Sequence, residues 1–339
     1  MLGKILITAI NAIVPIVLLI LLGYVLKQKN FINDNFIKIG NKLMFNICLP
    51  CMLFVNVYEI GGIGDINWDV VIYSVSVICL LAVIGFAAAV TVTPVPKRKG
   101  VIMQCAFRSN FAIIGMPLAE ALGGSAGASV TAVVSAFSIP TINILAVIAL
   151  TIFMEDTGDN KHHFRKVLTG IVKNPLIIGV GAGLIALLIR ELQVQIWGET
   201  PFRLSRDLKF LYTVLSNLKA ITSPLAMIVL GGGFVFSAVK GLFKEIAVGT
   251  FMRLILAPVL GLGGAIVLSS CTDLLRCGPG EYATMIALFG SPVAVSSAVM
   301  AISMKNDEQL ATQLVVWTSI GSILTIFLQV CILMAFGYL

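Results

Sequence analysis

The run Arg108-Ser-Asn-Phe-Ala-Ile-Ile-Gly-Met-Pro117 interrupts an apolar segment long enough to cross a lipid bilayer, and Ile286-Ala-Leu-Phe-Gly-Ser-Pro292 interrupts a second one. Both runs end in Gly-x-Pro, as Gly115-Met-Pro117 and Gly290-Ser-Pro292. Proline removes a backbone N–H donor and clashes with the preceding turn, so each segment is predicted to break there into two half-helices. Two such breaks in corresponding halves of a membrane protein point to a transporter binding site between them.

The composition indicates a protein that lies almost entirely within a membrane. Of the 339 residues, 58% are hydrophobic and 12% charged, and the mean hydropathy is +1.03. These values exclude an ordinary soluble globule. The net charge of +7 comes from basic residues that collect between apolar spans, which indicates membrane-protein loops rather than nucleic-acid binding. The seven cysteines show no metal-ligand clustering, and we expect no metal or cofactor.

Crossing the hydrocarbon core takes roughly 20 apolar residues. By that measure the chain is predicted to be all-α, with ten transmembrane helices near residues 5–26, 37–57, 69–92, 100–122, 128–153, 174–196, 210–235, 246–270, 282–303 and 312–337. The polar connection at 155–173 divides a first half, 1–154, from a second half, 174–339. Each half then holds five spans, so the second enters the membrane from the opposite side and the two form an inverted repeat.

Short sequence matches between the halves support this repeat. Ile47-Cys-Leu-Pro50 corresponds to Ile221-Thr-Ser-Pro224. At the breaks, four residues of the first half are identical to four of the second in a single register: Ala112, Gly115, Pro117 and Ala119 match Ala287, Gly290, Pro292 and Ala294. The crossing segments are therefore predicted to be spans 4 and 9.

Lysine and arginine distribution predicts the orientation. Connections after odd-numbered spans hold fourteen basic residues, and the opposite side holds six. Because cytoplasmic loops carry the excess of Lys and Arg, the odd connections are predicted to be cytoplasmic and both termini outside, in a multi-pass protein of the plasma membrane. The connection after span 6 departs from this pattern, since it carries four of the six basic residues on the outer side.

A broken helix inside a membrane leaves unpaired backbone groups, which must line a cavity or be buried in protein. The first residues of each second half-helix carry free N–H groups and partial positive charge, so they attract anions. Two such ends meeting near the bilayer midplane suit a carboxylate. The alternative is that the prolines only shape helix packing.

The predicted substrate site consists of the break residues and the polar side chains around them. These are Asn110, Ser109, Arg108, Gly115, Pro117, Gly290, Ser291, Pro292, Ser296, Asn46 and Ser223. Ser297, Thr284 and Thr222 are further hydrogen-bonding candidates. Arg108, Lys219 and Arg253 are the basic residues within spans, and each either lines the pathway or extends to the membrane surface.

The sixteen acidic residues fall in connections or near span ends, with Glu120 and Glu245 the least clear of them. An interior with cations and without a central carboxylate favours an anionic substrate over cation antiport.

The chain contains four characteristic motifs: Arg108-Ser-Asn-(aromatic)-x-x-x-Gly-x-Pro117, Asn46-Ile-Cys-Leu-Pro50, Ser223-Pro224 followed by Gly231-Gly-Gly233, and Ser291-Pro292-Val-Ala. They resemble those of the auxin efflux carrier family, in the form of its prokaryotic organic-anion permeases. The resemblance covers essentially the whole chain. It implies a ten-helix fold in which helices 1, 2, 6 and 7 form a scaffold and helices 3–5 and 8–10 a moving domain. It also implies transport of malonate, malate or auxin-like acids, a scaffold-mediated homodimer, and Asn110 as the crossover asparagine near the substrate carboxylate.

Other function classes fit less well. A sodium- or proton-coupled antiporter, or a bile-acid-type symporter, also uses crossed broken helices; H⁺ or Na⁺ remains a possible coupling ion for the anion carrier too. Gly62-Ile-Gly-Asp65 has the Gly-x-Gly-Asp pattern of intramembrane aspartyl proteases, but it falls in a predicted loop without a second intramembrane Asp. An enzyme is therefore the least favoured class.

Overall fold

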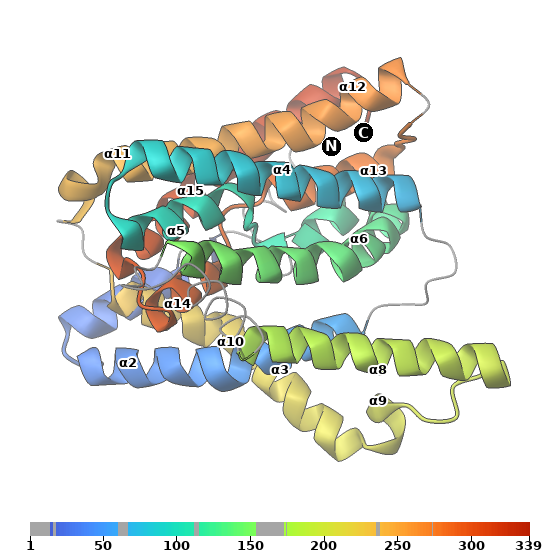
Figure 1. Ribbon diagram of the computed structural model, residues 1–339, viewed down its shortest axis with the longest axis horizontal. Coiled ribbons are helices and arrows are strands. Elements are labelled where there is room, and N and C mark those ends of the chain that lie inside the picture. The colour runs from blue at the N-terminus through green and yellow to red at the C-terminus, as the bar shows by residue number, and fades with distance from the viewer. Residues whose placement is uncertain are drawn as a thin grey trace, which may run out of the picture.

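The computed structural model describes residues 14–15, 18–59, 67–111, 115–153, 173, 175–234, 238–272 and 274–339. Within these ranges the chain is helical and forms no β-strand. Most of the helices run side by side along the long axis of the molecule (Figure 1). Seven helical stretches of the described chain are long and apolar enough to cross a membrane: Asp34–Tyr58, Trp68–Val92, Val133–Ile152, Pro175–Trp197, Lys209–Gly232, Val239–Cys271 and Glu308–Ala335.

These seven stretches overlap predicted spans 2, 3, 5, 6, 7, 8 and 10, whereas predicted spans 1, 4 and 9 contain shorter helices within the described residues. The bounds of the helices are α2 Asp34–Leu43, η1 Met44–Cys48, α3 Leu49–Tyr58, α4 Trp68–Val92, α5 Pro96–Phe107, α6 Met116–Ile152, α8 Pro175–Trp197, α9 Leu204–Asp207, α10 Lys209–Gly232, α11 Ala238–Phe251, η3 Met252–Leu256, η4 Val259–Gly263, α12 Gly264–Cys271, α13 Pro279–Met285, η5 Ile286–Gly290, α14 Val295–Ser303 and α15 Glu308–Ala335. The first span is described in part, as a helix at Leu18–Gln28. Two predicted features, Gly62–Asp65 and most of the 155–173 connection, lie outside the described residues.

Gly124 divides α6 into the end of one predicted span and the whole of the next. Its φ of 59° and ψ of −147° lie in a region that only glycine adopts without strain. The chain turns at this residue, which lies within the boundary predicted between 122 and 128.

The helices form two bundles. The first contains Leu18–Gln28, α2–η1–α3, α8 and α10, and the second contains α4, α5, α6, α11–α12, α13–η5–α14 and α15 (Figure 1). These are the groups that the resemblance assigns to a scaffold and to a moving domain. The bundles meet along a seam where α14 packs on α2, η1 and α10, and α6 packs on α8.

The two predicted breaks differ in detail. The second one is confirmed: η5 ends at Gly290, Ser291 is extended with φ −63° and ψ 147°, and α14 begins at Val295. The first prediction placed its break at Gly115–Pro117, but Gly115 has helical φ and ψ and Pro117 lies in the first turn of α6. The non-helical residues come earlier, at Arg108–Asn110 after the end of α5.

Four prolines follow π-helical backbone by two residues. The segments η1, η3 and η5 end at Cys48, Leu256 and Gly290, ahead of Pro50, Pro258 and Pro292. Gly115 is also π-helical and precedes Pro117. Because proline cannot donate to the carbonyl four residues earlier, the preceding turn widens instead. In both Gly-x-Pro motifs the glycine is therefore π-helical, but only in the second motif is the glycine followed by extended backbone.

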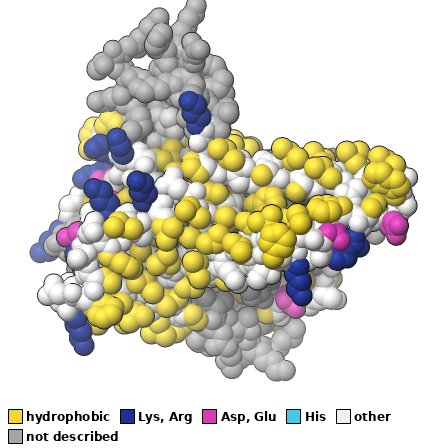
Figure 2. All heavy atoms as spheres, turned by 90° about the horizontal axis from the view of Figure 1, so that it is seen from below, with side chains coloured by type: hydrophobic (Ala, Val, Ile, Leu, Met, Phe, Trp, Pro, Cys, Tyr) yellow, Lys and Arg dark blue, Asp and Glu magenta, His cyan; other side chains and the backbone are white. Residues whose placement is uncertain are grey.

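The outer surface matches a protein surrounded by lipid. Figure 2 shows a broad hydrophobic band with Lys and Arg gathered at one end and mixed charges at the other. Large apolar side chains of α4, α8 and α10 are exposed, among them Val83, Ile185 and Phe210. Exposed apolar faces of this extent are stable in contact with lipid rather than with water.

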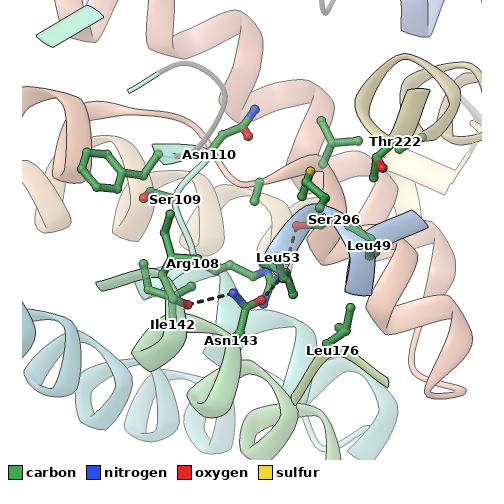
Figure 3. A pocket seen from close by; sticks show the side chains of 16 residues that line it. Leu49, Leu53, Arg108, Ser109, Asn110, Ile142, Asn143, Leu176, Thr222 and Ser296 are labelled. Atoms are coloured by element: carbon green, nitrogen blue, oxygen red, sulfur yellow. Dashed lines mark hydrogen bonds between the residues drawn. The ribbon is translucent and has the colours of Figure 1, made fainter. Parts of the chain in front are cut away.

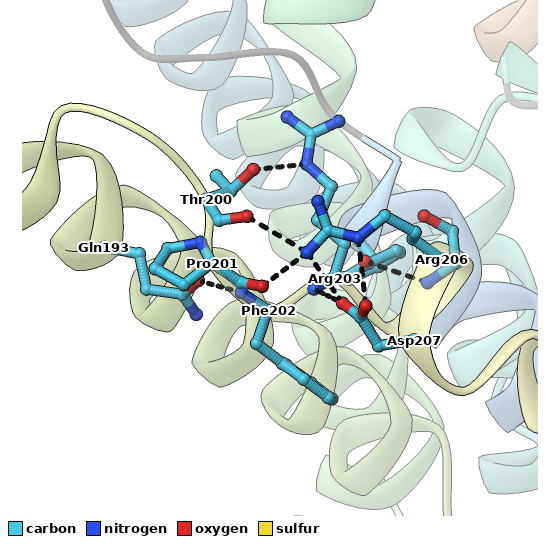
Figure 4. Close-up of polar contacts among 9 residues, drawn as sticks. Gln193, Thr200, Pro201, Phe202, Arg203, Arg206 and Asp207 are labelled. Atoms are coloured by element: carbon cyan, nitrogen blue, oxygen red, sulfur yellow. Dashed lines mark hydrogen bonds and ion pairs between the residues drawn. The ribbon is translucent and has the colours of Figure 1, made fainter.

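The charges after span 6 are held in a local network at the end opposite the main basic cluster. Asp207 accepts a hydrogen bond from Arg206 Nε at 2.9 Å and from the Arg203 backbone N–H at 2.6 Å, while Arg203 Nε donates to Thr200 (Figure 4). These bonds, the Arg206 bond foremost, hold the pKa of Asp207 below its ordinary value. Partial neutralisation explains why this connection carries Arg without following the predicted asymmetry.

Candidate functional site

The two unwound segments pair with each other through their backbones. Ser109 and Val293 form an isolated antiparallel bridge. Asn110 N–H donates to the Pro292 carbonyl at 2.8 Å, and Ala294 N–H donates to the Arg108 carbonyl at 3.2 Å. Val293 N–H donates to the Thr318 hydroxyl on α15 at 3.1 Å. Breaking the helices leaves these groups without intrahelical partners, and the crossing supplies partners for them.

Arg253, a residue of η3, is fully buried and contacts the ends of both broken helices. Its guanidinium donates to the carbonyls of Ser291, Leu288 and Phe289 at 2.9, 3.0 and 2.7 Å, and to that of Ala106 at 3.4 Å. These carbonyls belong to the C-terminal ends of α5 and η5, where the helix dipoles place partial negative charge. One cation therefore neutralises both half-helix C-termini.

A cavity of about 50 Å³ lies beside the crossing, at the seam between the bundles. One wall comes from α3, α8 and α10 and is apolar apart from Thr222. The other wall carries Arg108, Ser109, Asn110, Asn143 and Ser296 (Figure 3). The residues that line the cavity include no Asp or Glu. All but one of its polar side chains thus belong to a single bundle.

Arg108 is the main charge of this site and is only 3% exposed. Its Nη2 donates to Asn143 Oδ1 at 3.1 Å and to Ser296 Oγ at 3.0 Å (Figure 3). Its Nε and Nη1 make no hydrogen bond with any described residue. A buried guanidinium without a carboxylate is costly unless its remaining N–H groups are satisfied, so the geometry favours an anionic ligand.

Further unpaired donors surround the same cavity. Within the described chain, Asn110 Nδ2 and Ser109 Oγ are buried without a hydrogen-bond partner. Val295 and Ser296, the first residues of α14, also line the cavity. Their backbone N–H groups have no acceptor within the helix, as in the first turn of any helix. Together with Nε and Nη1 of Arg108 they form a group of donors for which the described residues supply no acceptor.

The structure brings together four of the residues predicted for the site: Arg108, Ser109, Asn110 and Ser296. The others lie elsewhere. Asn46 is exposed, and its amide donates to the Lys42 carbonyl of its own helix. Ser291 is buried and donates to the Ala287 carbonyl at 2.5 Å, so it supports the break rather than the cavity.

The remaining predicted positions do not line the cavity either. Gly115 packs on Phe111, Gly290 packs on Gln329, and Pro292 contributes its carbonyl to the crossing. The side chains of Pro117 and Ser223 lie outside the described atoms.

Asn143 is a site residue that the sequence did not reveal. It lies on α6, 35 positions after Arg108, and its Nδ2 donates to the Ile139 carbonyl at 2.8 Å while its Oδ1 orients Arg108. A polar amide inside an apolar span was the available signal. Lys219, in contrast, extends to an ion pair with Glu59 outside the cavity.

Comparison with known proteins adds to this geometry. Residues 8–330 match the family model described as membrane transport protein. The chain belongs to this family. The match confirms the resemblance to auxin efflux carriers stated from the motifs. The chain is also similar to an uncharacterized transporter of Methanothermobacter thermautotrophicus, with 21% identity over 325 residues that cover 93% of this chain and 95% of the relative. The protein is therefore a multi-pass membrane transporter.

Proposed function

We propose that this transporter is a secondary carrier of small organic anions, namely carboxylates such as malonate, malate or auxin-like acids. The observation that carries the proposal is the buried Arg108 guanidinium, whose Nε and Nη1 make no hydrogen bond within the described chain and lie beside a cavity whose described lining has no acidic side chain. A carboxylate supplies both the missing charge and the missing acceptors. Asn110 Nδ2 and Ser109 Oγ are the additional donors.

The charge distribution across the crossing also favours an anionic substrate. Arg253 neutralises the C-terminal ends of the half-helices through four carbonyl contacts. The N-terminal end of α14 and Arg108 remain without a counter-charge on the cavity side. The net potential of the cavity is positive, which attracts an anion and repels the cation that an antiporter carries.

The size of the cavity supports alternating access. About 50 Å³ holds a few water molecules, so admission of a dicarboxylate requires the two bundles to separate. The unpaired donors belong to one bundle, and we propose that the substrate moves with that bundle against the apolar wall of the other. The predicted ten-helix inverted repeat, with halves 1–154 and 174–339, provides two related conformations for this movement.

We further propose that the basic end of the molecule faces the cytoplasm and that the protein resides in the plasma membrane as a scaffold-mediated homodimer. H⁺ or Na⁺ is the candidate coupling ion. A sodium- or proton-coupled antiporter or a bile-acid-type symporter is the alternative, and the absence of Asp and Glu from the cavity lining argues against it.

The test compares Asn110→Ala and Arg108→Gln with the wild-type protein. Purified protein is screened by thermal shift against small mono- and dicarboxylates, with and without sodium at several pH values, and uptake is measured in proteoliposomes. Hydrogen bonds to charged groups are worth about 1.5–3 kcal/mol, so each variant is expected to lose roughly 10–100-fold in apparent affinity.

Asn46→Ala is the matched control, because Asn46 has the same amide but contacts only its own helix. It is expected to transport normally. Wild-type kinetics in a folded Asn110→Ala variant would overturn the proposed site. Cation exchange without any requirement for an organic anion would overturn the proposed substrate class.

A further inference from the structure

A second, larger cavity lies at the basic end of the seam, with a volume of about 490 Å³. Its α2 wall carries Lys38 and Asn41, and its α15 wall carries Glu308 and Gln309. Asn41 is only 4% exposed, yet neither its Oδ1 nor its Nδ2 has a hydrogen-bond partner in the described chain. A buried amide with both groups unpaired is costly, and a polar occupant of the cavity removes that cost.

Three helices contribute residues to both cavities from one face each. Ala226 of α10 lines the central cavity, and Gly233, the C-cap of α10, lines the second one. On α14, Val295 lines the central cavity and Ile302 the second one. The spacing of seven residues places each pair on one side of its helix.

The third helix is α2–η1–α3, where Asn41 lines the second cavity and Leu49 the central one. The π-helical segment η1 between them takes more residues per turn, so Asn41 and Leu49 lie on the same side of the helix, about two turns apart. The two cavities therefore lie along a single line in the seam.

The residues between the cavities are buried and apolar. Phe45, Val229 and Val299 occupy the intermediate positions of the three helices and belong to one packed cluster. They are 8%, 2% and 2% exposed. In this conformation an apolar barrier of one to two helical turns separates the central cavity from the second one.

We propose that the second cavity is the entry site of the route to the central cavity, where Lys38 and the Asn41 amide hold the same anion before the Phe45–Val229–Val299 barrier opens. This inference rests on the proposed function. The other charged lining residues fit it: Lys27 is neutralised by Asp34 at 2.6 Å, and Glu308 lies on the opposite bundle. When the bundles separate, Glu308 moves away with the second bundle and Lys38 stays on α2.

The test uses small thiol reagents, so it does not depend on knowing the substrate. Ile302→Cys reports on the second cavity and Ala226→Cys on the central one. Each is treated with the anionic 2-sulfonatoethyl methanethiosulfonate or with neutral methyl methanethiosulfonate, and mass spectrometry measures the rate at each cysteine. We expect the Ile302→Cys thiol to react at least ~10-fold faster than the Ala226→Cys thiol, because the barrier blocks the latter.

The barrier is tested by adding Phe45→Ala, which is expected to raise the rate at Ala226→Cys by about tenfold and leave Ile302→Cys unchanged. If Phe45→Ala does not fold, Val299→Ala replaces it as the variant that opens the barrier. Phe210→Ala is the matched control, since Phe210 is exposed on α10 far from the barrier. Equal rates in folded Phe45→Ala, Val299→Ala and Phe210→Ala variants would overturn the route.

The entry site is tested by charge. Lys38→Gln is expected to lower the ratio of anionic to neutral reagent rates at Ile302→Cys by about threefold, because the local anion concentration falls. Lys29→Gln removes a nearby exposed lysine that does not line the cavity, and it is expected to leave the ratio unchanged. An identical ratio in both variants would overturn the entry site, whatever the transport assays show.

Discussion

Arg253 and Arg108 are both buried guanidinium groups at the helix crossing, but their surroundings give them different roles. Arg253 donates to four backbone carbonyls through all three of its guanidinium nitrogens, and it does not line the central cavity. Arg108 uses only Nη2 and leaves Nε and Nη1 unpaired at the cavity. At the residue scale, the first is a structural cap and the second is a binding group.

Replacement of Arg253 by Met is expected to lower the free energy of unfolding by about 3 kcal/mol or more, because several buried carbonyls lose their donor. Arg253→Lys is expected to rescue only part of this loss, since an ammonium does not reproduce the planar guanidinium fork. The melting temperature in detergent measures both. Lys219→Met is the control: its exposed pair with Glu59 is worth at most about 1 kcal/mol, and a larger loss there than at Arg253 would contradict the assignment.

At the scale of elements, close helix contacts depend on small residues. The helix Leu18–Gln28 crosses α10 at two glycines: a Cβ on Gly231 would lie 1.8 Å from the Ile20 carbonyl oxygen, and one on Gly23 would lie 2.0 Å from that of Ile228. The obstacles are backbone atoms, which cannot rotate away. This contact ties the first helix to the seam-forming α10.

Gly231→Ala is therefore expected to force the helices apart and to lower stability by about 2 kcal/mol. Gly241→Ala, on α11, is the matched control, because nothing lies within 4 Å of its added Cβ. That variant is expected to be neutral or slightly stabilising, since alanine favours helix. Thermal unfolding of the two purified variants decides the matter; equal melting temperatures would show that the close approach is not required.

At the scale of the whole molecule, transport by this geometry requires the two bundles to move relative to each other. Gly233 caps α10 in the first bundle, and a Cβ there would lie 3.3 Å from Glu308 Oε1 in the second. Both residues line the second cavity, so a bridge between them spans the seam there and does not touch the central cavity.

The double variant Gly233→Cys/Glu308→Cys, bridged by Hg²⁺, is expected to lose at least ~10-fold in uptake and to recover when a thiol removes the mercury. The control pair Gly123→Cys/Ala283→Cys lies within one bundle, where the Gly123 Cβ position is 3.0 Å from the Ala283 Cβ. Bridging it is expected to change uptake by less than about twofold. Undiminished uptake with the seam bridged would rule out relative movement of the bundles.

The sequence alone determined the features that depend on local chemistry. Apolar run lengths predicted the seven helices that are long enough to cross a membrane. Pro292 predicted a break that the structure contains, and the motif around Asn110 predicted the family. The scarcity of intramembrane acids predicted an interior without a central carboxylate, and the described residues that line the central cavity include no Asp or Glu. Each of these follows from hydropathy, proline geometry or residue type within a few turns of one helix.

The tertiary structure decided which residues meet. The first break lies at Arg108–Asn110 rather than at Gly115–Pro117 because these residues pair with the extended backbone of the second break. Asn143 reaches Arg108 and Arg253 reaches the carbonyls of η5 only through packing between distant helices. Asn46, predicted for the site, faces outward because helix rotation in a bundle depends on all of its neighbours, which no local pattern encodes.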